Sequence, residues 1–171
     1  MVGFTGSRHL AQSHFPLVAR VVAGFAGQGC AVGCAAGLDK AVRLAAPAAS
    51  LQVFRASRFG PGPAVSRLVK RSVAMVQAVA ASPSPFMVGF VSVACPPGVA
   101  PSPVAGQCFC GGGSGSWATL ALAAGLGVPL VVFWCGPGAP LLPGWGSWVA
   151  AAGPLAGGWQ FAPGVGQSSL F

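Results

Sequence analysis

The apolar run from Ser116 to Trp134 limits the possible folds of this chain more than any other feature of its sequence. The run carries no charge, and as one continuous helix it is long enough to cross a bilayer. It is interrupted at Gly125, Gly127 and Pro129. These residues divide it into a predicted helix at 117–126 and a predicted strand at 128–134. A helix of about ten residues spans about 15 Å, half of the hydrocarbon core, so the interruptions favour a buried helix and strand over a membrane span.

Short apolar segments alternate with segments of helical periodicity along the first 135 residues. Strands are predicted at 2–5, 29–33, 51–54, 86–93 and 128–134. Helices are predicted at 15–25, 37–45, 63–81 and 117–126, and a loop rich in proline and glycine at 94–113. This alternation predicts an α/β fold: an open parallel sheet with helices on both faces, in three layers. Strands buried on both sides are continuous apolar runs, as these are.

Charge is confined to the first part of the chain. All nine Lys and Arg lie at or before Arg71, Asp39 is the only acid, and the net charge is +8. The chain contains no Glu, Asn, Ile or Tyr. A basic half is typical of proteins that bind polyphosphates, nucleic acids or anionic membranes. The alternative is that a chain almost without acids is basic whatever it binds.

The six cysteines do not form a metal-binding pattern. They lie at positions 30, 34, 95, 108, 110 and 135, without the paired spacing of zinc ribbons, and the two histidines are distant in sequence. We expect free thiols in a reducing compartment, no metal and no cofactor. The amino terminus lacks an apolar segment of signal-peptide length, so we expect a cytoplasmic protein.

Three turns place candidate binding residues where strands end or helices begin. The residues are Gly6, Ser7 and Arg8 after the first strand, Gly37 and Asp39 after the second, and Gly112, Gly113, Ser114, Gly115, Ser116 and Thr119 before the last helix. Ligands of open α/β sheets bind at the carboxyl ends of strands, and free amides at a helix N-terminus attract anions. Each turn alone also has a structural interpretation: a solvated Arg8, for example, or Asp39 as a partner of the helix dipole.

Taken together, these turns resemble the SLOG superfamily of Rossmann-like domains, which includes the DNA-processing A (Smf) proteins and the Lonely Guy phosphoribohydrolases. The resemblance is carried by GSR at 6–8, GCAAGLD at 33–39 and GGSGSWAT at 112–119. The stretch RSVAM at 71–75 is similar to the Arg-Lys-x-x-Met helix motif of Lonely Guy enzymes. The order and spacing match over about three quarters of the chain.

The resemblance implies a nucleotide site. It implies that the amides around Gly113 and Gly115, with Ser116, bind a nucleotide phosphate, and that Arg71 acts on the ribose phosphate. Two positions depart from the enzymes: the glutamate of their GGxGTxxE motif is Thr119, and the lysine of their arginine motif is Ser72. Cleavage of an N-glycosidic bond needs a carboxylate, and only Asp39 is available.

We therefore expect nucleotide binding without turnover, and three alternatives remain open. The first is single-stranded nucleic-acid binding through a basic set of residues, namely Arg55, Arg58, Arg67, Lys70 and Arg71. The second is phosphoribohydrolase activity with Arg71 and Asp39 as catalytic residues. The third is membrane association through the uncharged half and its five tryptophans, which fit equally well against a neighbouring subunit.

The last 36 residues form a distinct segment by composition. We expect a nucleotide-binding core at 1–135 and an extension at 136–171, rich in Gly, Pro and Trp, that packs on the core or on a neighbouring subunit. One edge strand is predicted near 159–162. Apolar surface that a chain cannot cover by itself often marks an interface, so we expect a homo-oligomer and no membrane partner.

Overall fold

The computed structural model describes residues 1–111 and 113–163. All the strands of these residues belong to one seven-stranded sheet. The strand order is β3-β2-β1-β4-β5-β7-β6. The first five strands in sequence pair in parallel, and the last two are antiparallel to their neighbours. The strands are β1 (Val2–Gly6), β2 (Cys30–Val32), β3 (Leu51–Val53), β4 (Phe86–Val91), β5 (Leu130–Trp134), β6 (Gly146–Ala150) and β7 (Trp159–Pro163).

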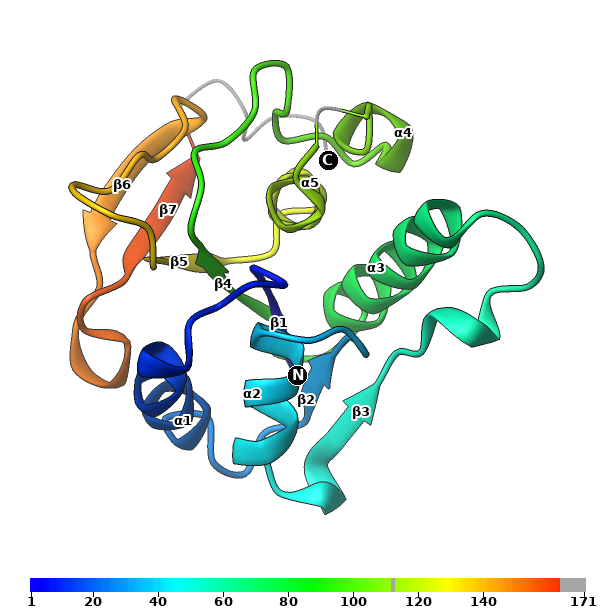
Figure 1. Cartoon of the computed structure of the whole chain (residues 1–171). Coiled ribbons are helices and arrows are strands. Elements are labelled where there is room, and N and C mark those ends of the chain that lie inside the picture. Colours follow the sequence, from blue (N-terminus) through cyan, green and yellow to red (C-terminus); the bar gives the residue numbers. More distant parts are fainter. Residues whose placement is uncertain (112, 164–171) are drawn as a thin grey trace.

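Helices cover both faces of the sheet (Figure 1). They are α1 (Phe15–Ala23), α2 (Leu38–Ala45), α3 (Ala64–Ala80), α4 (Ala105–Cys108) and α5 (Gly115–Gly125). Side chains of α1 and α2 pack with Val2, Phe4 and Val88 on one face, and those of α3 and α5 pack with Met87, Leu130 and Val132 on the other. The predicted three-layer, Rossmann-like α/β fold is confirmed.

Burial explains why the central strands contain so few polar residues. All five positions of β4 from Met87 to Val91 are buried, and β1 is buried from Val2 to Thr5. Side chains alternate between the two core clusters along β4, with Met87 in one and Val88 in the other. A strand covered on both faces therefore needs an apolar residue at every position.

The run from Ser116 to Trp134 folds as most of helix α5 followed by strand β5. Helix α5 is buried from Trp117 to Ala123, and it crosses the sheet beside β4 and β1. Leu126 and Gly127 end it, and Gly127 has a φ of 71° that suits a helix terminus. Among the residues that the structure describes, no helix is both long and apolar enough to span a bilayer.

The described part of the extension adds two strands to the sheet. The strand predicted at 159–162 is real, but it was expected at an edge and lies between β5 and β6. The edge strand β6 was not predicted. Trp145 packs edge-on against Trp117 of α5, with ring centroids 5.6 Å apart, and against Phe161 of β7. An aromatic cluster within the chain thus attaches the extension to the helical layer.

Smaller corrections concern element ends. Helix α1 ends at Ala23, two residues before the predicted end, and β2 is limited to Cys30–Val32, between Gly29 and Gly33. The short helix α4 lies in the segment predicted as loop. It is held by Ser102, whose hydroxyl accepts from the Val104 amide (3.0 Å).

Candidate functional site

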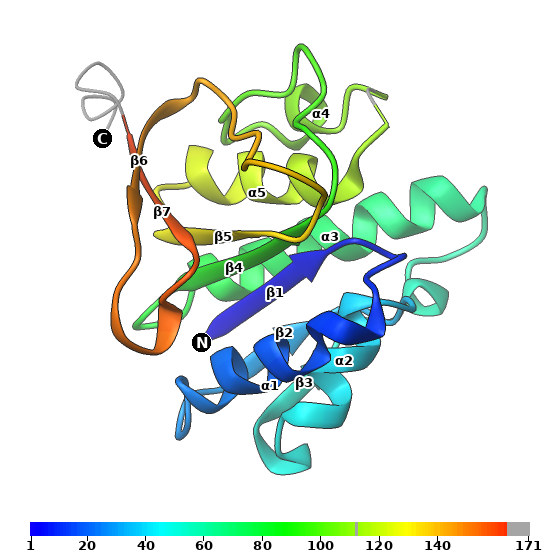
Figure 2. The same cartoon turned by 60° about the vertical axis from the view of Figure 1, so that its left-hand side comes forward.

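The candidate site lies at the carboxyl edge of the sheet, where β1 and β4 are neighbours. The chain leaves β1 toward α1 on one face and leaves β4 toward α5 on the other. Figure 2 shows β1 and β4 ending on the side where the chain enters α5. Ligands of open α/β sheets bind at such a reversal of connections, because the two departing loops leave a crevice between them.

The first turn, Gly6–Ser7–Arg8, is fixed by its backbone. The Ser7 amide donates to the Phe90 carbonyl of β4 (2.9 Å), and the Ser7 hydroxyl accepts from the His9 amide (3.2 Å). A side chain at Gly6 would collide with the same Phe90 carbonyl. Arg8 is exposed and makes no hydrogen bond to the described residues. The turn is therefore rigid and presents one free guanidinium.

The second turn rests directly on the first. Gly37 has a φ of 61° and a ψ of −122°, and a Cβ there would collide with the carbonyls of Ser7 and Arg8. The next amide, that of Leu38, donates to the Ser7 carbonyl (3.1 Å). Only glycine permits both the conformation and the close approach. The two turns predicted as binding elements thus form one packed unit.

Asp39 and Arg71 form a buried ion pair beside this unit. Asp39 Oδ2 lies 3.1 Å from Arg71 Nη1 and accepts from the Ala35 amide at 2.9 Å. The two side chains are 8% and 13% exposed. Both groups lie over Gly33, where a Cβ would meet them. The single acid of the chain therefore holds the β2–α2 turn against α3, a partnership that sequence reasoning did not identify.

Arg43 holds the other side of the same turn. Its guanidinium donates to the carbonyls of Gly33 (3.0 Å) and Ala35 (3.2 Å). Two arginines from different helices thus fix the residues between β2 and α2.

The third turn leads into α5. Ser114 caps the helix by accepting from the Trp117 amide (3.4 Å), and the amides of Gly115 and Ser116 have no acceptor among the described residues. Trp117 anchors this helix end, because its indole donates to the Val93 carbonyl after β4 (2.8 Å). Two backbone donors and the hydroxyl of the partly exposed Ser116 therefore lie at the carboxyl edge.

Three other residues predicted for this turn have different outcomes. Thr119 was expected to contact ligand, but it is 1% exposed and its hydroxyl donates to the Gly115 carbonyl inside α5 (2.6 Å). It lies one helical turn too deep to reach the surface. Gly113 is exposed with a φ of 96°, and Gly112 lies outside the described residues.

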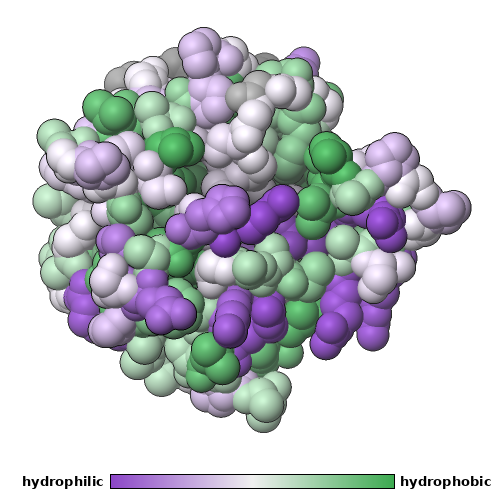
Figure 3. Space-filling model, viewed as in Figure 1, coloured by the Kyte–Doolittle hydropathy of each residue, from purple (hydrophilic) through white to green (hydrophobic). Residues whose placement is uncertain are grey.

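The basic side chains of the chain differ in whether they have a bonding partner. Arg20, Arg43 and Arg71 bond to described residues, whereas six other basic side chains have no such partner. These are Arg8, Lys40, Arg55, Arg58, Arg67 and Lys70. Figure 3 shows hydrophilic surface concentrated across the middle and lower part of the molecule, over α2, β3 and the loop leading to α3. The surface above it, over α4 and α5, is pale or apolar.

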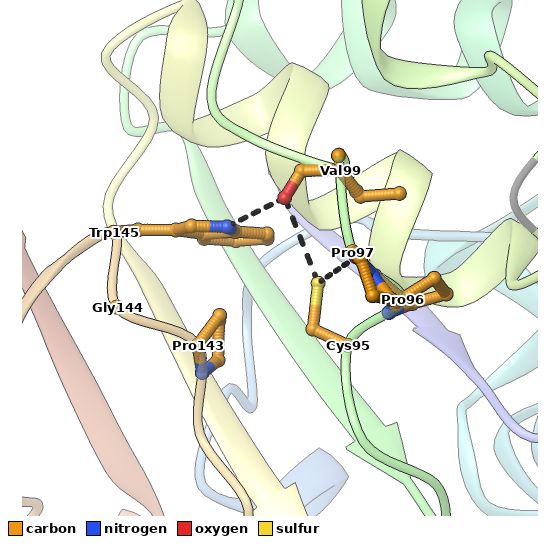
Figure 4. A pocket seen from close by; sticks show the side chains of 8 residues that line it. Cys95, Pro96, Pro97, Val99, Pro143, Gly144 and Trp145 are labelled. Carbon is orange, nitrogen blue, oxygen red and sulfur yellow. Dashed lines mark hydrogen bonds between the residues drawn. The ribbon is translucent and has the colours of Figure 1, made fainter.

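Sequence reasoning missed a hollow of about 260 Å³ between the loops that follow β4 and β5 (Figure 4). It is lined by Cys95, Pro96, Val99, Pro143 and Trp145, among others. The Trp145 indole donates to the Val99 carbonyl (2.8 Å), which joins the two loops. Clusters of Pro and Gly at 96–98 and 143–144 were the available signal. None of the side chains that line the hollow is charged, unlike those of the basic turns.

Four of the six cysteines have thiols of low reactivity. Burial raises the pKa of Cys95 and of Cys135 to about 11, and it also raises the pKa of Cys30 and Cys108. Thiols of this kind stay protonated near neutral pH and are poor nucleophiles. Within residues 1–111 and 113–163, no group of three or more His, Cys, Asp or Glu could hold a metal ion.

No protein-family model, curated protein or solved structure matches this chain. The interpretation of the site therefore depends on its geometry and chemistry.

Proposed function

We propose that this chain binds a phosphate-bearing small molecule of the nucleotide type, as a SLOG-like domain, and does not turn it over. The observation that carries the proposal is the pair of amides at Gly115 and Ser116, which lack an acceptor among the described residues at the start of a well-anchored helix. A helix N-terminus with free amides favours an anion through its hydrogen bonds and its dipole.

The neighbouring groups suit the same ligand. Arg8 extends from the rigid β1 turn without a partner among the described residues, and a guanidinium binds phosphate oxygens in a bidentate manner. The hydroxyl of Ser116 offers a further donor. The sole acid, Asp39, is held by Arg71, so it adds little repulsion to a bound phosphate.

The lack of an available carboxylate at the site is the reason that we propose binding without turnover. A phosphoribohydrolase needs a carboxylate near the bond that it cleaves. The position expected to supply it is Thr119, which is buried in α5, and Asp39 already bonds to Arg71 and to the Ala35 amide through one oxygen. We therefore propose a binding role for this site, with Arg71 as a structural residue.

Isothermal titration with nucleoside monophosphates, nucleoside diphosphates and NAD tests the proposal. We expect saturable binding to the folded protein, and a Kd at least about tenfold higher for Arg8→Ala or for Ser116→Glu, since each removes attraction from the phosphate or adds repulsion to it. Arg58→Ala is the control for net charge, because Arg58 is exposed in the short 3-10 helix before α3. Equal weakening by Arg58→Ala, or no binding by the wild type, would contradict the proposal.

The charge distribution favours one second candidate, binding of single-stranded nucleic acid. The short 3-10 helix η3 (Ala56–Arg58) packs against α3, so Arg58 lies near the helix that carries Arg67 and Lys70. Both residues of α3 lie in its first two turns, where the helix dipole disfavours cations and no acid compensates them. An anionic strand across this surface would remove the repulsion.

Salt dependence distinguishes the two candidates. Neutralising n phosphates with Lys or Arg gives a slope of about −0.7n for log K against log salt on single strands. We expect Arg58→Ala and Lys70→Ala each to reduce this slope and to leave mononucleotide binding unchanged. Oligonucleotide binding that does not weaken as salt rises would contradict the second candidate.

A further inference from the structure

The outer strand of the extension, β6, forms a free edge of the sheet. No strand of residues 1–111 and 113–163 pairs with it on the side away from β7. Four of its five residues are exposed, and Trp148 is half-buried. Such an edge offers a row of unpaired backbone groups to another strand.

The register with β7 shows which backbone groups are free. Ala150 faces Trp159, and the ladder continues to Ala151, whose amide donates to the Gly158 carbonyl (2.9 Å). Hydrogen-bonded and non-hydrogen-bonded pairs alternate in an antiparallel ladder. Ser147 and Val149 therefore bond to β7. The residues that direct both N–H and C=O outward are Gly146, Trp148 and Ala150.

This pattern is complementary to itself. If two copies of β6 run antiparallel about a two-fold axis beside Trp148, the outward residues meet each other. Gly146 then faces Ala150 of the partner subunit, and Trp148 faces Trp148 of the partner subunit. Each pair exchanges both of its hydrogen bonds, as in an ordinary antiparallel ladder.

Charge supports a second copy as the occupant. No Lys, Arg, Asp or Glu occurs after Arg71, so β6 lacks the charged residues with which proteins commonly protect an edge. Most basic side chains lie on or beside β1, α2, β3 and α3, away from β6; the exception is Arg20 of α1, whose guanidinium donates to the carbonyls of Pro154 and Ala156 between β6 and β7. The other edge strand, β3, has three residues and is followed by the exposed Arg55. Joining at β6 therefore brings together fewer like charges than joining at β3.

We propose that this chain forms a closed two-fold homodimer by antiparallel pairing of β6 with β6 of a second copy. The proposal is independent of the proposed ligand. Val149, which is 53% exposed, would then lie opposite Ser147 of the partner subunit, and burial of its isopropyl group adds to the interface.

Two experiments test the proposal: the mass of the protein in solution, and a proline substitution in β6. We expect sedimentation equilibrium to give twice the 16.8 kDa chain mass, with no larger species. Ala150→Pro removes an outward N–H and leaves the bonds to β7 intact, so the dimer Kd should rise by at least about tenfold. Ala150→Ser retains the N–H and should remain dimeric. A single-chain mass at about 100 μM, where a dimer of micromolar Kd is assembled, or an unchanged dimer in Ala150→Pro, would overturn the proposal.

A disulfide test fixes the register even if Ala150→Pro fails to fold. Ser147 and Val149 of the partner subunit would form a non-hydrogen-bonded pair, with Cβ atoms about 4.5–5.5 Å apart. In a background with the exposed Cys110→Ser, we expect an oxidised cross-link when Ser147→Cys chains are mixed with Val149→Cys chains. Either variant alone should cross-link far less. Equal cross-linking of the single variants, or none in the mixture, would refute this register.

Discussion

Asp39, the only acid of the chain, forms its ion pair with Arg71. Their ion pair is largely buried and connects the turn after β2 with helix α3. A buried pair of this kind is costly to break from one side, because the remaining charge keeps its desolvation penalty. The chain therefore depends on the pair for local structure, whatever the site binds.

Removal of Arg71 tests this dependence. We expect Arg71→Ala to lower the free energy of unfolding by about 3 kcal/mol, because it leaves the Asp39 carboxylate buried without its cation. Adding Asp39→Ala should restore part of that loss, since the unpaired charge is then absent. Urea denaturation followed by tryptophan fluorescence measures both values. A loss in the double variant equal to the sum of the losses in Arg71→Ala and in Asp39→Ala would show that the two residues act independently.

A second prediction concerns the effect of a side chain at Gly37 on stability. Gly37→Ala should cost about 2 kcal/mol or more, because its φ is 61° and the new methyl group meets the carbonyls of Ser7 and Arg8. Gly27→Ala is the matched control: its φ is 85°, but nothing lies within 4 Å of the added carbon, so it should cost about 1 kcal/mol. Similar losses of unfolding free energy in the two variants would mean that the contact between the turns is unimportant.

The buried thiols predict how stability depends on pH. Cys95 and Cys135 have pKa values near 11 in the folded protein, against about 9 for an ordinary thiol. Above pH 9 the unfolded chain therefore binds fewer protons than the folded one, and stability falls as pH rises from 9 to 11. Urea midpoints at pH 8, 9.5 and 10.5 measure the fall, which should be smaller in Cys95→Ala/Cys135→Ala. A midpoint that stays constant would contradict the assignment.

The elements differ in how far their own sequences determine them. Strands β1, β4 and β5 and helix α3 follow from apolar runs and helical periodicity, so they are close to the predicted ranges. Strand β6 has the sequence GSWVA, too short and too exposed to show a pattern. The position of β7 inside the sheet depends on pairing with β5, which local sequence does not encode. The buried aromatic cluster supplies that tertiary information.

Substitution of Trp145 tests whether the aromatic cluster anchors the extension. Its ring contacts Trp117, Trp148 and Phe161, and its indole donates to Val99. We expect Trp145→Ala to destabilise the protein by about 2–3 kcal/mol. Hydrogen exchange should increase first in β6 and β7, which lose their anchor on α5. Trp159→Ala is the control, since Trp159 belongs to neither core cluster of the described residues. A larger loss in the control would contradict this role for Trp145.

At the level of the whole molecule, most of the charge and the proposed dimer edge lie on different parts of the sheet. Basic side chains occur only in the first 71 residues, and most lie around β1, α2 and α3, although Arg20 bonds to the connection between β6 and β7. The residues that form α5, β5 and the β6–β7 edge carry no charged side chain. Such a division allows one end to attract anions while the other associates with a second copy. The two proposals thus concern different surfaces and can fail separately.

Sequence alone predicted much of the candidate site, because the carboxyl ends of parallel strands meet at one edge. The turns at Gly6–Arg8 and Gly37 are in contact, and the start of α5 lies at the same edge. Two features of the site could not be predicted from the sequence. The pairing of Asp39 with Arg71 joins residues 32 positions apart, and the burial of Thr119 depends on how α5 packs on β4.

The measurement that tests the central claim most directly is a titration of the ¹⁵N-labelled protein with a nucleoside monophosphate, followed residue by residue through its backbone amides. A bound phosphate should shift the amides of Gly115 and Ser116 most, with smaller changes in the turn that carries Arg8. Ser116→Glu should abolish the shifts, because it places a negative charge at the N-terminus of α5. Saturable binding that shifts only α3 and η3, or the absence of any shift at millimolar nucleotide, would contradict the phosphate site.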